Sequence, residues 1–384
     1  MEKFEIIAKT LFGFEELLAE ELESIGATDI ELLTRAVRYR GDTELLYRSN
    51  LVLRTAIKIL KPIATFTVHD DKQLYEKVRS IDWSEYLMPI DTFAIDGITH
   101  SNYFNHSKYV ALKTKDAIAD QFRDKYNKRP SVDIENPDVR VSVHIADTTC
   151  TISLDSTGRS LGKRGYKTSQ VYAPLSEVLA AGIILLSEWD RETDFIDPMC
   201  GSGTIPIEAA LIARNIPSGC FREFTFENWN DFDEDLWEKI REEEFGKICE
   251  FEGNIVGYDV DPKAIEISRA NAGRADLDDM IIFEKNDFVT GEPKYKLGHI
   301  VMNPPYGERL EEDNDMLEFY GELGTKLKHY YEGSDAWIIS ANLRALKFVG
   351  LRPSRKIKLF NGPLECRLQK FELYKGSKKD RYLK

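Results

Sequence analysis

The residues with the clearest chemical meaning are Asn303, Pro304, Pro305 and Tyr306, which follow the apolar run 298–302. An exocyclic amine of a nucleobase is a weak nucleophile, because its lone pair is delocalised into the ring. The Asn303 side-chain oxygen and the Pro304 carbonyl could each accept one N–H of such an amine and stabilise the positive charge that develops during attack. Tyr306 could stack on the base. The tetrapeptide therefore predicts methyl transfer to a planar amine, although it also fits a rigid turn that ends a strand.

A second group of residues could hold the methyl donor. Asp197 and Pro198 end a predicted strand, Gly201 and Gly203 form a turn, and Thr204 begins a predicted helix. Glycines at these positions allow the backbone to approach a ligand closely. The spacing is neither a dinucleotide fingerprint nor a P-loop, so a nicotinamide or nucleoside-triphosphate site is disfavoured.

Two acids end the next two predicted strands. Asp259 could accept hydrogen bonds from both hydroxyls of a ribose, and Asp287 could accept one from an adenine amine, with Phe288 packing beside the adenine ring. Each acid alone is more often a helix N-cap than a ligand. Their order is informative, because three successive strand ends offer glycines, a ribose acceptor and an adenine acceptor, and a fourth offers the amine-binding turn at Asn303.

This order resembles the class I methyltransferases that use S-adenosyl-L-methionine, and among them the amino-methylating group marked by Asn-Pro-Pro-Tyr. The resemblance covers roughly residues 170–384. It implies that Gly201 and Gly203 shape the loop under the methionine moiety, that Asp197 lies near this moiety, and that Asp259 and Asp287 hold the ribose and the adenine. The full set of cofactor-binding residues that we expect is Asp197, Pro198, Gly201, Gly203, Thr204, Asp259, Asp287, Phe288 and Asn303.

The elements that must position these residues alternate between strands and helices. From residue 173 we expect helices at 175–187, 204–213 and 262–272 and strands at 194–197, 254–258 and 281–285. Such β-α-β alternation predicts a doubly wound, mostly parallel, Rossmann-like α/β sheet. The first half reads as α+β, with strands at 4–8, 30–39, 92–98, 139–145 and 149–154 and helices at 15–25, 42–50, 70–80 and 108–126.

The front half carries a second resemblance. Residues 4–18 and 47–56 resemble the front of methyltransferases that contain a THUMP domain, and residues 154–166 with 173–175 match that family's joint to its catalytic domain. The resemblance implies a bacterial enzyme that methylates the N2 amine of guanine in structured RNA, usually 23S ribosomal RNA. It also implies a ferredoxin-like segment and a THUMP domain that dock RNA, and a base flipped into the pocket between Asn303 and Tyr306.

The chain's length of 384 residues exceeds one ordinary core, so we expect about two or three domains. We predict a ferredoxin-like segment at 1–60, a THUMP domain at 61–158, a linker at 159–172 and a methyltransferase domain at 173–384. An aromatic and acidic insertion at 217–253 explains the long spacing from Asp197 to Asp259. It could be a cover over the sheet or a partner-facing lobe, but a solvated acidic helix is slightly favoured.

The net charge of −14 argues against a nucleic-acid partner, yet two local runs are basic. They span residues 108–129 and 159–167, and either could meet phosphate. A solvated helix face and a polar linker are equally good interpretations. The candidate RNA ligands in these runs are Lys113, Lys115, Arg123, Lys163 and Arg164.

Cysteine usage and hydropathy limit the class of protein. The five cysteines form no CxxC or Cys/His cluster, which favours a reduced cytoplasm and no bound metal. No apolar run is long enough to span a membrane, and the first residues lack the pattern of a signal peptide. The sequence does not predict an oligomeric state.

Three rival functions stay open. A transfer-RNA guanine-N2 methyltransferase is the nearest, because THUMP domains serve both RNA classes. An adenine-N6 nucleic-acid methyltransferase is less favoured, since no target-recognition domain is evident. An RNA-binding protein with a decayed catalytic domain is disfavoured, because the residues at the site keep identities that are competent for the chemistry, namely Gly201, Gly203, Asp259, Asp287, Asn303 and Tyr306.

Overall fold

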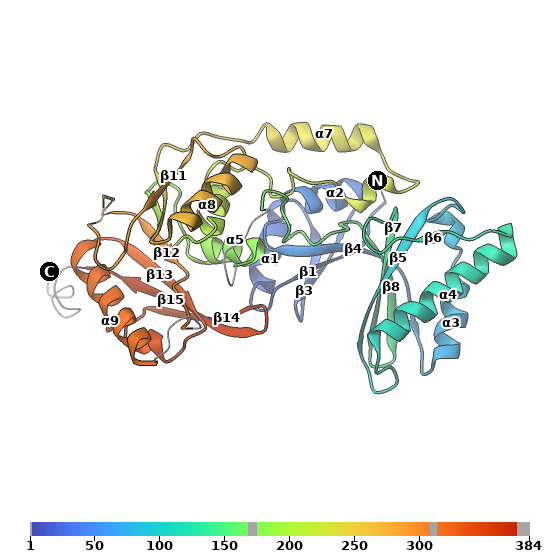
Figure 1. Ribbon diagram of the computed structural model, residues 1–384. Helices are drawn as coiled ribbons and strands as arrows, with labels where there is room; N and C mark the ends of the chain where they lie inside the picture. The colour runs from blue at the N-terminus through green and yellow to red at the C-terminus, as the bar shows by residue number, and fades with distance from the viewer. Residues whose placement is uncertain (1, 168–174, 293, 296, 308–312, 375–384) are drawn as a thin grey trace. The chain divides into compact units, whose positions relative to one another are not determined.

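The computed structural model describes residues 2–167, 175–292, 294–295, 297–307 and 313–374 (Figure 1). The chain divides into two compact units. The first comprises Met1–Thr10, Leu18–Leu161 and Arg222–Glu244, and the second comprises Leu11–Leu17, Gly162–Phe221 and Phe245–Lys384. The predicted linker at 159–172 lies outside the described residues from residue 168 onward.

The first unit contains an eight-stranded sheet in the order β2-β3-β1-β4-β8-β7-β5-β6. Its strands are β1 (Phe4–Thr10), β2 (Thr28–Leu33), β3 (Ala36–Gly41), β4 (Ala56–Thr67), β5 (Thr92–His100), β6 (Ser131–Val132), β7 (Val139–Ala146) and β8 (Thr149–Asp155). Its helical segments include α2 (Thr43–Val52), α3 (Asp71–Arg79), the 3-10 helix η1 (Trp83–Glu85) and α4 (Ser107–Tyr126). Helix α1 (Glu15–Ser24) crosses the boundary between the units.

Strand β4 joins the two α+β parts of this unit. It pairs with β1 along one edge and with β8 along the other, so both parts share one continuous sheet. A shift in register between Pro62 and Ala64 accommodates the proline, which cannot donate to a sheet ladder. The α+β class is confirmed, but no element was predicted at residues 51–67, so the shared strand β4 was not expected.

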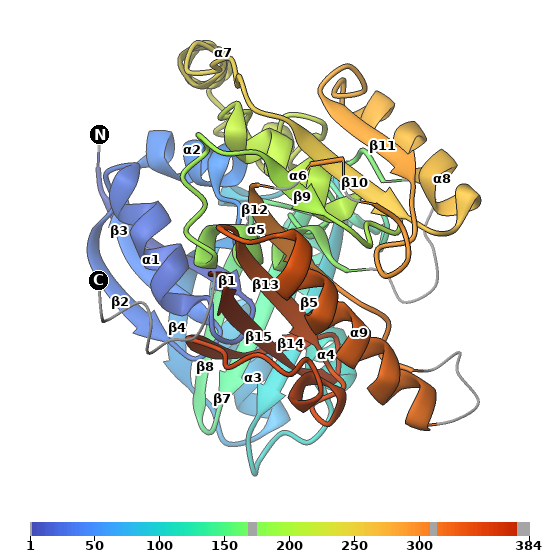
Figure 2. The same cartoon turned by 90° about the vertical axis from the view of Figure 1, so that its left-hand side faces the viewer.

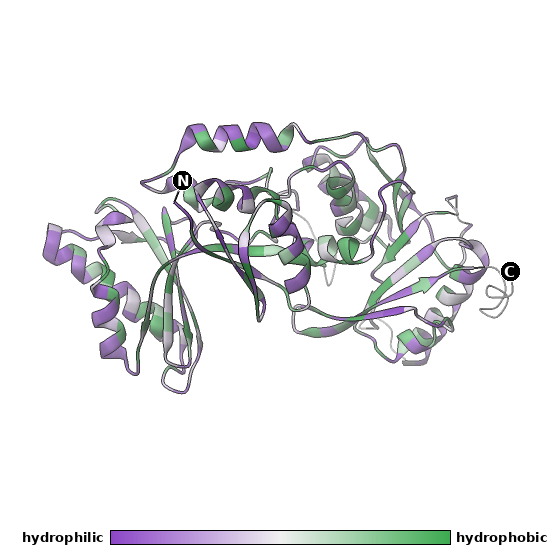
Figure 3. Cartoon of the chain, turned by 180° about the vertical axis from the view of Figure 1, so that it is seen from behind, coloured by the Kyte–Doolittle hydropathy of each residue, from purple (hydrophilic) through white to green (hydrophobic). Residues whose placement is uncertain are grey.

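Most of the acidic insertion packs within the first unit. The 3-10 helix η2 (Thr225–Asn228) and α7 (Glu234–Phe245) contribute Phe226, Trp237 and Ile240 to the unit's hydrophobic core. The Tyr47 ring of α2 stacks on Phe226 with 4.2 Å between the ring centroids. Residues 222–244 are therefore part of the first unit. Apart from Leu236, Trp237, Ile240 and Phe245, the residues of α7 are charged, and most of the helix is coloured as hydrophilic in Figure 3.

The second unit contains a seven-stranded sheet in the order β11-β10-β9-β12-β13-β15-β14. Its strands are β9 (Phe195–Asp197), β10 (Ile255–Asp259), β11 (Ile281–Lys285), β12 (His299–Met302), β13 (Asp335–Ser340), β14 (Arg355–Asn361) and β15 (Leu364–Glu372). Strands β9 to β13 are parallel, and β15 is antiparallel to β13 and β14. The predicted Rossmann-like, mostly parallel sheet is confirmed.

Helices flank this sheet (Figure 2). They are α5 (Glu177–Leu186), α6 (Thr204–Ala213), α8 (Pro262–Arg274), α9 (Asp313–Tyr330) and the short 3-10 helix η3 (Ala345–Lys347). In α9, Met316, Tyr320, Leu323 and Leu327 are buried at the three- and four-residue spacing of one helix face. This face packs into a core with strand residues such as Ile300. Among the described helices, none is both long and apolar enough to cross a membrane.

Candidate active site

The carboxyl ends of four parallel strands carry the predicted site residues. Strand β9 lies between β10 and β12, and β11 follows β10. The chain moves from β9 to β10 and β11 on one side and returns to β12 on the other, so the strand order reverses between β9 and β12. Such a switch point is where ligands bind in open α/β sheets. The sheet therefore brings the glycine turn, Asp259, Asp287 and Asn303 to one edge.

The turn after β9 needs its glycines. Gly201 and Gly203 have φ values of +55° and +80°, in the left-handed region that L side chains rarely adopt. A Cβ added at Gly203 would lie 2.8 Å from the Ser268 Cβ and 3.0 Å from the Phe283 ring. Thr204 begins α6 directly after this turn. The backbone N–H groups at the start of α6 therefore lie at the glycine turn, where an anion is favoured.

Asp259 ties the ends of β9 and β10 together. Its Oδ2 accepts a hydrogen bond from the Gly201 N–H at 2.9 Å, and its Oδ1 accepts one from the Asp261 N–H at 2.9 Å. Each carboxylate oxygen has a second lone pair. Asp259 can therefore hold the turn and still accept hydrogen bonds from a pair of hydroxyl groups.

Asp197 is a buried acid with an unsatisfied oxygen. Its side chain is 1% exposed, and its Oδ1 accepts a hydrogen bond from the Met199 N–H at 3.1 Å. Its Oδ2 is buried and has no hydrogen-bond partner among the described residues. Burial, with the nearby charge of Asp259, raises the pKa of Asp197 well above its usual range. A cation beside Oδ2 would supply the missing partner. Pro198, next to Asp197, is also buried.

The loop after β11 presents Asp287 but not Phe288. The exposed Asp287 accepts hydrogen bonds from the Val289 and Thr290 N–H groups through Oδ1. Burial opposes the charged form of Asp287, but these hydrogen bonds, together with the Thr290 side chain and the charge of Lys326, lower its pKa. Phe288 is 5% exposed and stacks on Tyr331, so it belongs to the core. The packing of Phe288 beside an adenine ring stays a prediction.

Two other side chains donate hydrogen bonds to backbone carbonyls of the turn after β12. The Tyr320 hydroxyl donates to the Pro305 carbonyl at 3.3 Å, and the Asn342 amide donates to the Tyr306 carbonyl at 3.1 Å. Within the turn, the Tyr306 hydroxyl donates to the Asn303 Oδ1 at 2.6 Å. Burial raises the pKa of Tyr306, so this hydroxyl stays protonated. Tyr320 and Asn342 were not predicted from the sequence, since no local motif marks them.

The three candidate RNA ligands on α4 already face acids. Lys113 lies 3.6 Å from Asp71, Lys115 lies 2.8 Å from Asp116, and Arg123 lies 2.6 Å from Asp120. Exposed pairs of this kind are weak and can exchange an acid for a phosphate. The three residues stay candidates, on a helix face of mixed charge.

The candidates in the second basic run have opposite environments. Lys163 is exposed, whereas Arg164 is fully buried and its Nε lies 3.5 Å from the Glu208 carboxylate. A guanidinium in this position cannot reach an RNA phosphate, so the prediction for Arg164 was wrong. The sequence shows the basic run but not the buried acid of α6 that pairs with it. Nearby, Lys167 hydrogen-bonds Thr204, a contact that the sequence analysis also missed.

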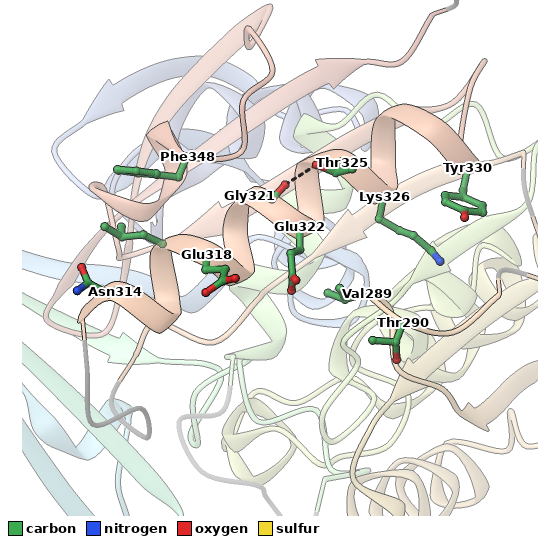
Figure 4. A pocket seen from close by; sticks show the side chains of 11 residues that line it. Val289, Thr290, Asn314, Glu318, Gly321, Glu322, Thr325, Lys326, Tyr330 and Phe348 are labelled. Carbon is green, nitrogen blue, oxygen red and sulfur yellow. Dashed lines mark hydrogen bonds between the residues drawn. The ribbon is translucent and has the colours of Figure 1, made fainter.

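A separate open groove runs along α9 (Figure 4). Val289 and Thr290, which follow Asp287, form one wall, and Glu318, Glu322 and Lys326 of α9 belong to the other. The groove is lined by none of the predicted cofactor residues, so the row of strand ends remains the candidate active site.

Family models match three consecutive parts of the chain. The model for an RMKL-like methyltransferase domain matches residues 164–370, a THUMP-domain model matches residues 68–155, and an RlmL ferredoxin-like model matches residues 5–60. The first match alone covers more than half of the chain.

Individual proteins agree with these models. A candidate RNA methyltransferase of Synechocystis, slr0064, is 38% identical, with 94% of this chain and 95% of that protein covered. The ribosomal RNA large subunit methyltransferase K/L of Syntrophotalea carbinolica is also 38% identical, but this chain spans 52% of its length. The crystal structure of SMU.472, a candidate methyltransferase in complex with SAH, superposes with a TM-score of 0.88 at 29% identity, covering 98% of this chain and 100% of that one.

Proposed function

This chain belongs to the family of RMKL-like methyltransferases, and on that premise we propose that it methylates the exocyclic N2 amine of a guanine in 23S ribosomal RNA. At the coarser level it is an RNA methyltransferase that depends on S-adenosyl-L-methionine. The observation that carries the site assignment is the single row formed by the glycine turn, Asp259, Asp287 and Asn303 at the switch point of the sheet.

The side chains of this row fit S-adenosyl-L-methionine. The glycine turn gives room for the methionine moiety, and the unpartnered Oδ2 of Asp197 suits its ammonium group. Asp259 and Asp287 keep lone pairs for the ribose hydroxyls and the adenine amine. When bound, the cofactor supplies an electrophilic methyl group on a sulfonium.

The chain's contribution to the reaction is orientation and charge stabilisation. Asn303 Oδ1 and the Pro304 carbonyl would accept the two N–H groups of the guanine amine and hold its nitrogen in line with the methyl group. Tyr306 would stack on the flipped base. Methylation makes the nitrogen acidic enough to lose a proton to water, so this site needs no strong general base. Asn303, Pro304 and Tyr306 are thus the proposed catalytic residues.

The partner that we propose is structured RNA, with ribosomal RNA favoured over transfer RNA. The THUMP and ferredoxin-like matches support RNA docking by the first unit. The large-subunit target comes from the name of a relative that is about twice as long as this chain. Lys113, Lys115, Arg123 and Lys163 are the proposed phosphate ligands. A cytoplasmic location and the domain limits given from the sequence are part of the same proposal.

Methyl transfer in vitro tests the substrate. The protein would be incubated with labelled S-adenosyl-L-methionine and either unmodified 23S ribosomal RNA or unmodified transfer RNA, and the product nucleosides would be separated. We expect label in N2-methylguanosine from the ribosomal RNA. Label only in transfer RNA would favour the nearest rival, and label only in N6-methyladenosine would refute the guanine assignment.

A decayed catalytic domain is tested by the cofactor alone. A protein that binds S-adenosyl-L-methionine gains stability by mass action, by about 2.7 kcal/mol at a hundredfold excess over the dissociation constant. We therefore expect a clear rise in the unfolding temperature at saturating cofactor. No rise would support the non-enzymatic alternative.

A further inference from the structure

Lys167 lies beside the glycine turn and has a donor to spare. Its ammonium donates to the Thr204 Oγ1 at 2.9 Å and to the Leu175 carbonyl at 2.9 Å. An ammonium has three N–H donors. Within the described part of the chain, the third one has no hydrogen-bond partner.

The position of this cation is electrostatically unfavourable. Thr204 is the first residue of α6, where unsatisfied backbone N–H groups create partial positive charge. Burial lowers the pKa of Lys167, and the charges of Glu177 and Glu208 only partly offset this effect. An anion between the ammonium and the first turn of α6 would neutralise the charge of Lys167 and accept hydrogen bonds from the free N–H groups of the helix.

The residues before Lys167 are fixed in place. Arg164 pairs with Glu208 of α6, and the Tyr166 hydroxyl donates to the same carboxylate at 3.0 Å. Gly165 has a φ of +113°, and a Cβ there would lie 2.4 Å from the Phe221 carbonyl oxygen. The backbone that presents Lys167 is therefore tied to α6 rather than free to swing away.

A second group near the turn, the Asp197 carboxyl, would be stabilised by a cation. The Asp197 Oδ2 is buried, lacks a partner among the described residues and lies at the start of the same turn. One acid and one base at a single turn match a zwitterion that has both a carboxylate and an ammonium. Free α-amino acids and the methionine moiety of the cofactor have this chemistry.

We propose that Lys167 is the counter-ion of the carboxylate of the cofactor's methionine moiety. This role rests on the proposed function, because it assumes that S-adenosyl-L-methionine occupies the strand-end row. The third N–H of Lys167 would donate to the carboxylate, together with the first N–H groups of α6. Lys167 thereby becomes a cofactor-binding residue in addition to those expected from the sequence.

A thermodynamic cycle with the full chain tests this role. Calorimetry would measure the affinity of the wild type and of Lys167→Met for S-adenosyl-L-methionine and for its decarboxylated analogue, which lacks only the carboxylate. A hydrogen bond to a charged group contributes about 1.5 to 3 kcal/mol, so we expect Lys167→Met to weaken S-adenosyl-L-methionine about 10- to 100-fold. The affinity for the decarboxylated analogue should not change. Lys167→Arg should restore part of the loss.

The controls separate the possible failures from one another. Lys356→Met removes an exposed lysine of β14 in the same unit and should leave both affinities unchanged. Equal weakening of both ligands by Lys167→Met would overturn the proposal, because Lys167 would then only support the turn. Unchanged binding of S-adenosyl-L-methionine to Lys167→Met would also overturn it. No binding to the wild type would overturn the proposed function itself. If Lys167→Met fails to fold, equal affinity of the wild type for the two ligands still refutes a carboxylate contact.

Discussion

At the residue scale, the Tyr306 hydroxyl occupies the Asn303 oxygen that we assign to the guanine amine. A base that enters the site must displace this hydroxyl or share Oδ1, which has two lone pairs. The hydrogen bond keeps the amide oriented while no base is present. The Asn303 amide thus has a fixed orientation, but the Tyr306 hydroxyl competes with the guanine amine for its oxygen.

Substitutions at Tyr306 separate its ring from its hydroxyl. We expect Tyr306→Phe to keep kcat/KM within about threefold, because the ring can still stack and the competing donor is gone. We expect Tyr306→Ala to lower kcat/KM about 10- to 100-fold, since base stacking contributes about 1 to 3 kcal/mol. Steady-state kinetics on the RNA substrate measures both. A Phe variant as impaired as the Ala variant would show that the hydroxyl, not the ring, is essential.

Asp197 predicts a conflict between stability and binding. The pKa of Asp197 is higher in the folded than in the unfolded state. The ionisation of this carboxyl therefore destabilises the folded protein as the pH rises above the pKa of the unfolded state. At neutral pH, Asp197→Asn should therefore raise the unfolding temperature of the free protein. It should also weaken cofactor binding about tenfold, because the ammonium loses a charged partner. Thermal unfolding and calorimetry test the two effects, and a destabilised variant with unchanged affinity would contradict both.

Residue types and spacing were sufficient to predict that the turn at Asn303 and the acids Asp197, Asp259 and Asp287 lie at the carboxyl ends of neighbouring parallel strands. They were insufficient where a distant side chain decides the environment. Arg164 reads as part of a basic run, but Glu208 of α6 holds it inside the protein. Phe288 follows an expected ligand, but Tyr331 holds it in the core.

At the element scale, the glycine turn joins β9 to α6 through two residues with positive φ, Gly201 and Gly203. Gly203→Ala would place a Cβ in the left-handed region and against Ser268, so we expect a loss of stability of about 1 to 3 kcal/mol. Gly273→Ala is the matched control, because Gly273 lies in α8 with open space around its Cβ position. The free energy of unfolding of the control should rise by about 0.5 to 1 kcal/mol, because alanine has a higher helix propensity than glycine. Urea unfolding compares the two, and equal effects would contradict the strain argument.

Elements with strong periodicity or clear end signals were predictable. Helix α8 begins with Asp261 as its N-cap and Pro262 at its first turn, and it matches the expected helix at 262–272. The C-terminal elements α9, β13, β14 and β15 were not assigned. Strand β4 was also missed, because Pro62 interrupts its pattern and only the bulge makes it compatible with a sheet.

At the scale of the whole molecule, the two compact units are not consecutive stretches of the chain. Residues 222–244 belong to the first unit, although the segments before and after them belong to the second. Aromatic residues of this segment contact α2, and its acidic run meets Arg48. Sequence spacing located the insertion but could not show its packing, because no local pattern encodes a partner so far along the chain.

The Arg48 contacts test this packing. Arg48 pairs with Glu44, Glu243 and Glu244, and the Glu244 side chain is only 8% exposed. Arg48→Met would remove an ion pair from the buried Glu244 carboxylate, so we expect a loss of about 3 kcal/mol in the free energy of unfolding. Lys239→Met removes an exposed partner of Glu243 and should change stability by less than about 0.5 kcal/mol. Urea unfolding of both variants checks the difference, and a neutral Arg48→Met would argue against the packed segment.

The most direct test of the account is the nucleoside content of RNA from cells that lack the gene. Digests of each large-subunit ribosomal RNA fragment and of transfer RNA would be compared before and after complementation with the wild type or with Asn303→Ala. We predict that N2-methylguanosine is lost from one large-subunit fragment, returns with the wild type and does not return with Asn303→Ala. Loss of a methyladenosine alone, or full restoration by Asn303→Ala, would contradict the account.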